Sequence, residues 1–146
     1  MDTIDLQIIA SLLEDGRITM KELGHRIGLT SPATIERVKK LEETGVISGY
    51  TAVVNINKVG LPVRAFVLVK VVSNDASKSL VAFCSTHRRV ISCHRITGDA
   101  DYIVEVATPA MDVLETVIDE FRQYGVTTTQ VILSSPVEHN VVSVVK

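Results

Sequence analysis

The stretch TMKELGHRIGLTSPATIERVKKL, residues 19–41, predicts two short helices joined by a tight turn. Leu23 and Ile27 are four residues apart, so they share one face of the first helix, and Gly24 beside them lets a second helix approach closely. Gly28-Leu29 then provides the turn. This spacing is typical of a helix-turn-helix, whose second helix enters the major groove of DNA.

The second helix of this motif is predicted to begin at Ser31, whose hydroxyl can accept hydrogen bonds from the first-turn amides. Pro32 follows at a position where its missing N–H costs nothing. Helical spacing then predicts that one apolar stripe of this helix is buried, consisting of Ile35, Val38 and Leu41.

Positive charge is concentrated on the face opposite this stripe. The whole chain has a formal net charge of −2, whereas residues 31–41 carry three basic residues against one acidic residue. Arg37 and Lys40 have donors suited to guanine edges and phosphates, and the free amides of the helix N-terminus attract anions. The residues predicted to contact double-stranded DNA are Ser31, Ala33, Thr34, Arg37 and Lys40. In the alternative interpretation, three helices form a small bundle with a solvated basic surface.

A helix is also predicted ahead of the motif, after a cap at Asp2 or Thr3, and its apolar positions are Ile4, Ile8, Ile9 and Leu12. Beyond the motif the pattern changes to period two over Tyr50–Ile56, which predicts a strand. Turn-forming residues at 58–62 indicate a domain boundary. We therefore expect a helix-turn-helix domain at residues 1–48, a linking strand at 49–62 and a further domain at 63–146.

The second half of the chain alternates strand and helix patterns. Strands are predicted at 64–72, 90–97, 102–108 and 127–133, helices at 76–86 and 110–124, and an edge strand at 141–145. Pro109 and Gly125 bracket the second of these helices in the favoured order. The resulting βαββαβ order predicts a ferredoxin-like domain, so the whole chain is expected to be α+β.

Several classes of function are disfavoured by the composition. No apolar run reaches the ~18 residues of a membrane helix, and the N-terminus lacks the basic region of a secretory signal, so we expect a cytoplasmic protein. Cys84 and Cys93 have no second pair with which to bind zinc, and we interpret them as buried thiols. The four histidines lie in separate predicted elements. We therefore expect no enzyme activity, no metal site and no cofactor.

Four stretches of this chain together resemble the Lrp/AsnC (feast/famine) family of prokaryotic transcription regulators. They are Ile4-Asp5 with Ile8-Ile9 and Asp15-Gly16-Arg17; Glu22-Leu23 through Gly28-Leu29-Thr30 with Arg37-Val38 and Leu41-Glu42; GVISGY at 45–50; and GDADY at 98–102. Each stretch is weak alone, and their common order and spacing make the match specific.

The resemblance implies dimers formed through the linking strand and the tail sheet, with dimers joining into octamers or higher rings. It also implies that small molecules, often amino acids, bind where dimers meet. By position, the effector-binding residues are Gly98, Asp99, Asp101 and Thr129, and Asp101 suits an ammonium group. Val131 departs from a second polar position of the family. The alternative function is an architectural regulator that wraps DNA and has no effector.

Overall fold

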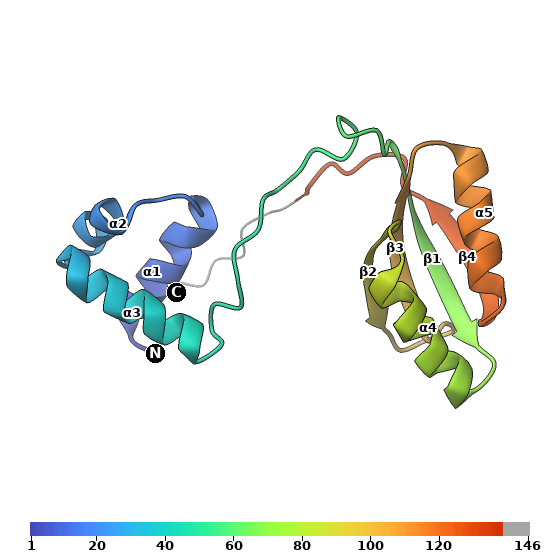
Figure 1. Ribbon diagram of the computed structural model, residues 1–146, viewed down its shortest axis with the longest axis horizontal. Helices are drawn as coiled ribbons and strands as arrows, with labels where there is room; N and C mark the ends of the chain where they lie inside the picture. Colours follow the sequence, from blue (N-terminus) through green and yellow to red (C-terminus); the bar gives the residue numbers. More distant parts are fainter. Residues whose placement is uncertain (139–146) are drawn as a thin grey trace. The chain divides into compact units, whose positions relative to one another are not determined.

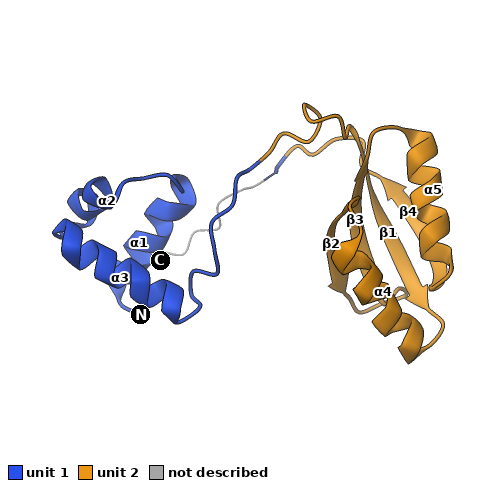
Figure 2. Cartoon of the chain, in the orientation of Figure 1, with its two compact units in different colours: residues 1–53, 137–146 blue, residues 54–136 orange. Residues whose placement is uncertain are grey.

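The computed structural model of the chain describes residues 1–138, and its contacts divide the chain into two compact units. The first contains residues 1–53 and the second residues 54–136 (Figure 2). The edge strand predicted at 141–145 lies outside the described residues. Across the described part of the chain, no helix is long and apolar enough to cross a membrane.

The first unit consists of three helices, α1 (Thr3–Glu14), α2 (Met20–Ile27) and α3 (Ser31–Glu43) (Figure 1). Asp2, one of the two predicted caps, caps α1, and Thr19 caps α2. Gly28 ends α2 with φ at 74°, a left-handed conformation that favours glycine. The helices enclose a small apolar core of Ile8, Ile18, Leu23, Val38 and Leu41. The predicted helix-turn-helix is thus confirmed.

Helix α3 departs from prediction at its start. Its N-cap is Thr30, whose hydroxyl oxygen accepts from the amide of Ala33 at 3.5 Å, so Ser31 is the first helical residue and not the cap. Ile35 is 51% exposed, whereas Thr34 is fully buried. The Thr34 hydroxyl can be buried because it donates to the carbonyl of Thr30 at 2.9 Å. The predicted apolar stripe is therefore wrong at Ile35, and Thr34 takes its place.

Residues 50–56 form no strand in this structure, contrary to prediction. The segment is almost entirely exposed, and Val53 and Val54 are 69% and 52% exposed. A strand requires a partner for its backbone N–H and C=O groups, and among the described residues none pairs with this segment. Because no strand pairs with it, this alternating segment stays outside any sheet.

The second unit is a four-stranded antiparallel sheet with two helices. In chain order its elements are β1 (Val63–Val71), α4 (Asn74–Thr86), β2 (Val90–Arg95), β3 (Tyr102–Thr108), α5 (Met111–Arg122) and β4 (Gly125–Val131). The sheet order β2-β3-β1-β4 places the first and third strands at the centre, as the predicted ferredoxin-like motif requires.

The two helices pack against one face of this sheet. Apolar side chains of α4 and α5, led by Leu80 and Phe121, contact Ala65, Val67 and Val69 of β1. Since side chains alternate along a strand, Phe66, Leu68 and Lys70 point to the opposite face. Within this unit, that second face carries no helix.

Gly125 has a different role from the predicted one. Helix α5 ends at Arg122, and its C-cap is Gln123 in the right-handed helical region. Gly125 is instead the first residue of β4, where a β carbon would collide with the carbonyl oxygen of Lys70. Glycine is required here because β4 approaches the end of β1 closely.

Candidate DNA interface and effector pocket

Helix α3 presents four of the five residues predicted to contact DNA. Lys40 is exposed, and Ser31, Ala33 and Arg37 are partly exposed. Thr34 is fully buried against the α2 side of the unit, where a β carbon on Gly24 would lie 2.8 Å from its hydroxyl oxygen. The prediction that Thr34 contacts DNA is therefore wrong, because its side chain cannot reach a ligand.

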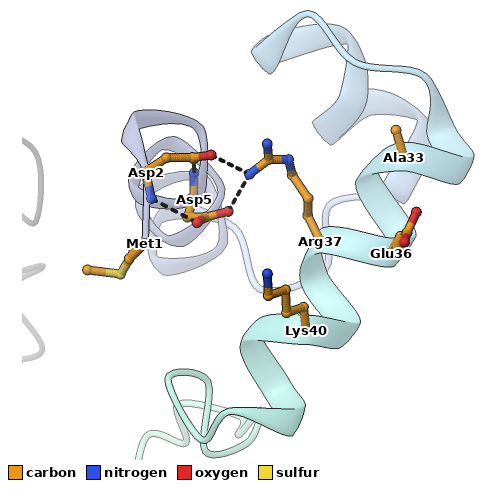
Figure 3. Close-up of a pocket in the computed structure, with 7 residues that line it drawn as sticks. All are labelled: Met1, Asp2, Asp5, Ala33, Glu36, Arg37 and Lys40. Atoms are coloured by element: carbon orange, nitrogen blue, oxygen red, sulfur yellow. Dashed lines mark hydrogen bonds and ion pairs between the residues drawn. The ribbon is translucent and has the colours of Figure 1, made fainter.

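Arg37 is held by the start of α1. Its Nη1 atom lies 2.8 Å from Asp2 Oδ2 and 2.7 Å from Asp5 Oδ1 (Figure 3). A hydrogen bond from the Asp5 amide and the Arg37 guanidinium lower the pKa of Asp2, and the same carboxylates raise the pKa of Arg37. Arg37 thus joins α3 to α1 before any DNA is bound.

Lys40 lies one turn after Arg37 and lines the same hollow, whose volume is about 460 Å³ (Figure 3). The rest of its lining is Met1, Asp2, Asp5, Ala33, Glu36 and Arg37. Unlike Arg37, the Lys40 ammonium group makes no ion pair within the described residues. Lys40 is therefore the basic residue of this face that is available to a phosphate.

A neighbouring face of α3 was missed by the sequence interpretation. Pro32, Ile35 and Lys39 are exposed and lie three or four residues apart, so they share one side of the helix. The apolar side chain of Ile35 and its helical spacing predict burial in the core, whereas the residue is 51% exposed. Lys39 forms a 3.5 Å ion pair with Glu43. In the sequence, only Thr34 could have indicated this face. Its hydroxyl can bond to a carbonyl of its own helix, so Thr34 can be buried in place of Ile35.

The acidic turn at 96–101 follows β2 and is fixed to the end of β1. The φ angle of Gly98 is 117°, a backbone conformation that residues with a side chain rarely adopt. Asp101 Oδ2 accepts from the amide of Val71 at 2.9 Å, and the Asp101 amide donates to the carbonyl of Val69 at 3.0 Å. The Asp101 carboxylate is therefore engaged by the backbone and fastens the turn to β1.

A hollow of about 590 Å³ lies beside this turn. Its lining residues are Leu68, Lys70, Ile96, Thr97, Asp99, Ala100, Val126 and Thr128. Of the four effector residues that the resemblance implies, Asp99 lines the hollow, Gly98 adjoins it, and neither Asp101 nor Thr129 is part of the lining.

The register of β4 explains why Thr128 and not Thr129 lines the hollow. Residues directly opposite each other in an antiparallel pair point to the same face. Thr129 is opposite Val67, which is fully buried beneath the helices, whereas Thr128 is opposite Leu68 on the uncovered face. Val131 is opposite buried Ala65, so it also points away from the hollow.

The two cysteines belong to the apolar core of the second unit. Cys84 is buried and Cys93 is partly buried, and both are free thiols. Burial raises the pKa of the Cys84 thiol to about 12, which keeps it protonated and unreactive near neutral pH. Among residues 1–138, no cluster of histidine, cysteine or acidic side chains could hold a metal ion.

A helix-turn-helix head joined to a ferredoxin-like tail with a surface hollow defines a helix-turn-helix transcription regulator with a ligand-binding domain. Comparison with known proteins agrees. A family model described as winged helix-turn-helix DNA-binding matches residues 1–48, and one described as Lrp/AsnC ligand binding domain matches residues 64–142. The chain belongs to the Lrp/AsnC family, whose members regulate transcription and are not enzymes.

Individual relatives resemble the chain over nearly its whole length. The HTH-type transcriptional regulator YezC of Bacillus subtilis (strain 168) is 44% identical over 135 residues, which is 92% of this chain and 95% of YezC. The structure of B. subtilis LrpC is 36% identical, covers 92% of this chain and 96% of its own, and has a TM-score of 0.86. Transcriptional regulator NMB0573 of Neisseria meningitidis, solved with L-methionine, is 26% identical, covers 94% of this chain and 93% of its own, and has a TM-score of 0.89.

Proposed function

We propose that this regulator is controlled by an amino acid that binds in the hollow beside the acidic turn. The observation that carries the proposal is the hollow itself, in which Asp99 and two threonine hydroxyls adjoin apolar side chains. The L-methionine complex of NMB0573 supports an amino acid as the class of ligand. A polar rim around apolar surface suits a molecule with a charged end and an apolar end.

For the helix-turn-helix unit we propose that Ser31, Ala33 and Lys40 contact double-stranded DNA. Arg37 also lies close to the duplex, and its main role is to hold α3 in position. Lys40 supports this proposal because its ammonium group is exposed and unpaired within the described residues. The head at 1–48, the linker at 49–62 and the tail at 63–146 then have separate tasks. We place this work in the cytoplasm, where bacterial and archaeal DNA lies.

We also propose that the chain acts as a homodimer and that dimers join into an octamer or a larger ring. The exposed Val53 and Val54 support this proposal, because alternating β-branched residues pair readily with a second copy. The uncovered sheet face, with Phe66 and Leu68, offers further apolar surface. A dimer presents two recognition helices about one helical turn of DNA apart, ~34 Å.

In this account the effector acts by linkage. It shifts DNA affinity only by as much as its own affinity differs between the assembly states. The test is a thermal-shift screen of the twenty amino acids, since a ligand selective for the folded assembly must raise the melting temperature. We expect at least one amino acid to do so. A screen without any shift, together with intact DNA binding, would favour an architectural regulator that has no effector.

A further inference from the structure

Ile35 is a large apolar side chain on the exposed surface of α3. Of the three large apolar residues of this helix, Val38 and Leu41 are each 5% exposed and lie in the core, whereas Ile35 is 51% exposed. Thr34 takes its place in the core, where its hydroxyl donates to the Thr30 carbonyl. An isoleucine that stays half in water contributes little to folding. Its position on the helix that a helix-turn-helix places in the major groove gives it a partner in DNA.

The surroundings of Ile35 on the helix are apolar as well. Recognition helices contact base edges with their N-terminal residues, and Ile35 lies in the N-terminal half of α3 (Ser31–Glu43). Pro32 is exposed three residues earlier, so the two side chains share one side of the helix. Neither side chain can donate or accept a hydrogen bond. This side of α3 therefore cannot read the hydrogen-bonding groups of a base, and it suits an apolar group.

Thymine is the base that presents an apolar group in the major groove, its C5-methyl, and apolar side chains recognise thymine by contacting this methyl. We propose that Ile35 determines part of the operator sequence by packing against the C5-methyl group of a thymine, with the Pro32 ring beside it. This inference rests on the proposed contact of α3 with DNA. It goes further, because it names a residue that reads a base and the group that this residue reads.

The charged residues of α3 are suited to other tasks. Arg37 is held by two carboxylates of α1 (Figure 3), and Lys40 suits a phosphate, which carries no sequence information. Lys39 follows Ile35 by one turn and pairs with Glu43 at 3.5 Å, but both side chains are more than 60% exposed, so a phosphate can replace this carboxylate. Lysines thus attach the helix to the DNA backbone, and the apolar side that Ile35 provides is left to distinguish bases.

Replacement of thymine by deoxyuridine isolates this contact, because it removes the C5-methyl group and keeps the base pair. A duplex is selected from a random library with the full-length protein, each thymine is replaced in turn, and binding is measured by fluorescence anisotropy. For the wild type we expect at least one thymine in each half-site whose replacement weakens binding about three- to tenfold.

The same replacement should have little effect on Ile35→Ala. This variant should bind the thymine duplex about three- to tenfold more weakly than the wild type, and deoxyuridine at the critical position should change its affinity by less than about twofold. On the deoxyuridine duplex the variant and the wild type should bind alike, which shows that the variant is folded. Its slope of log K against log salt should equal that of the wild type, because an apolar contact releases no counterions.

Two further variants complete the design. Ile35→Val keeps a branched apolar side chain and should retain most of the preference for thymine over deoxyuridine. Leu13→Ala truncates an apolar residue of α1 that is 47% exposed, and it should bind every duplex as the wild type does.

The outcomes separate this inference from the proposed DNA contact. If no replacement of thymine weakens the wild type, or if Ile35→Ala responds to the replacement as strongly as the wild type does, the inference falls while the proposed contact of α3 stands. If Ile35→Ala and Lys40→Ala both bind every duplex as tightly as the wild type, the proposed contact falls together with the inference.

Discussion

The Nη1 atom of Arg37 in α3 bridges Asp2 Oδ2 and Asp5 Oδ1 at 2.8 and 2.7 Å. The same two aspartates cap the first turn of α1 reciprocally, since each accepts the backbone amide of the other at 2.9 Å. One guanidinium therefore ties the N-terminal capping box to the middle of the recognition helix. The residue with the best donors for guanine is engaged inside the head, and its role in DNA binding must be separated from this structural one.

Replacing Arg37 with Ala should lower the melting temperature of the head and weaken DNA binding uniformly. The variant removes the tie between α1 and α3, so recognition should weaken on all sequences rather than relax at one base pair. Circular dichroism and binding to single-base variants of a duplex selected from a random library measure the two effects. A stable variant with ~1–3 kcal/mol of lost discrimination at one G·C pair would show instead that Arg37 reads a base.

The pH dependence of stability should reveal the Asp2 carboxylate. The Asp5 amide and Arg37 lower the pKa of Asp2 below its usual 3.8. A carboxyl whose pKa is lower in the folded state contributes stability that is complete above 3.8 and is lost as pH falls through the folded pKa. Asp2→Asn should therefore show a shallower loss of stability below about pH 4 than the wild type. Asp75→Asn, whose side chain is 95% exposed, is the control and should keep the wild-type slope.

Lys40 should act through phosphate. In Lys40→Ala we expect weaker binding to all duplexes, and the slope of log K against log salt should fall by about one unit. Fluorescence anisotropy at several salt concentrations measures this slope. Lys78→Ala, which removes an equal charge from the tail, should leave it unchanged. An unaltered slope in Lys40→Ala would remove this residue from the interface.

The contact between α2 and α3 depends on Gly24. A β carbon there would lie 2.7 Å from the Leu29 carbonyl oxygen and 2.8 Å from the Thr34 hydroxyl oxygen. Gly24→Ala should therefore cost ~1–3 kcal/mol in chemical denaturation and weaken DNA binding, because α3 must shift. At Gly16 the nearest atom would be 3.8 Å away, so Gly16→Ala should be close to neutral. Equal stability of both variants would contradict the close helix crossing.

Features that depend on neighbours in the chain were predicted well. Asp2 caps α1 because its side chain reaches the amide of Asp5 three residues ahead, a purely local interaction. The order of strands and helices in the tail follows from periodicity in the same way. Local chemistry was thus sufficient to predict the helix-turn-helix and the ferredoxin-like tail.

Features that depend on residues distant in the sequence, or on a partner strand that is absent, were not predicted. Thr34 is buried because Gly24 of another helix packs on it, and no local pattern ranks it above Ile35. Thr128 and Thr129 differ only in strand register, which reverses the face of every side chain with a slip of one residue. Residues 50–56 alternate as a strand does, yet a strand forms only where a partner is present. Lys70 lines the hollow beside the acidic turn, and the sequence pattern does not single it out because a lone lysine on a strand belongs to no motif.

Control of DNA binding by the effector is tested by measuring DNA affinity with and without the amino acid. A duplex selected from a random library is titrated with the full-length protein by fluorescence anisotropy, in buffer and in a saturating concentration of the amino acid that gives the largest thermal shift. We expect the midpoint of the DNA titration to move by about fivefold or more in one direction, and DNA to change the affinity for the amino acid by the same factor. An amino acid that binds the protein tightly and leaves the titration curve unchanged would contradict it.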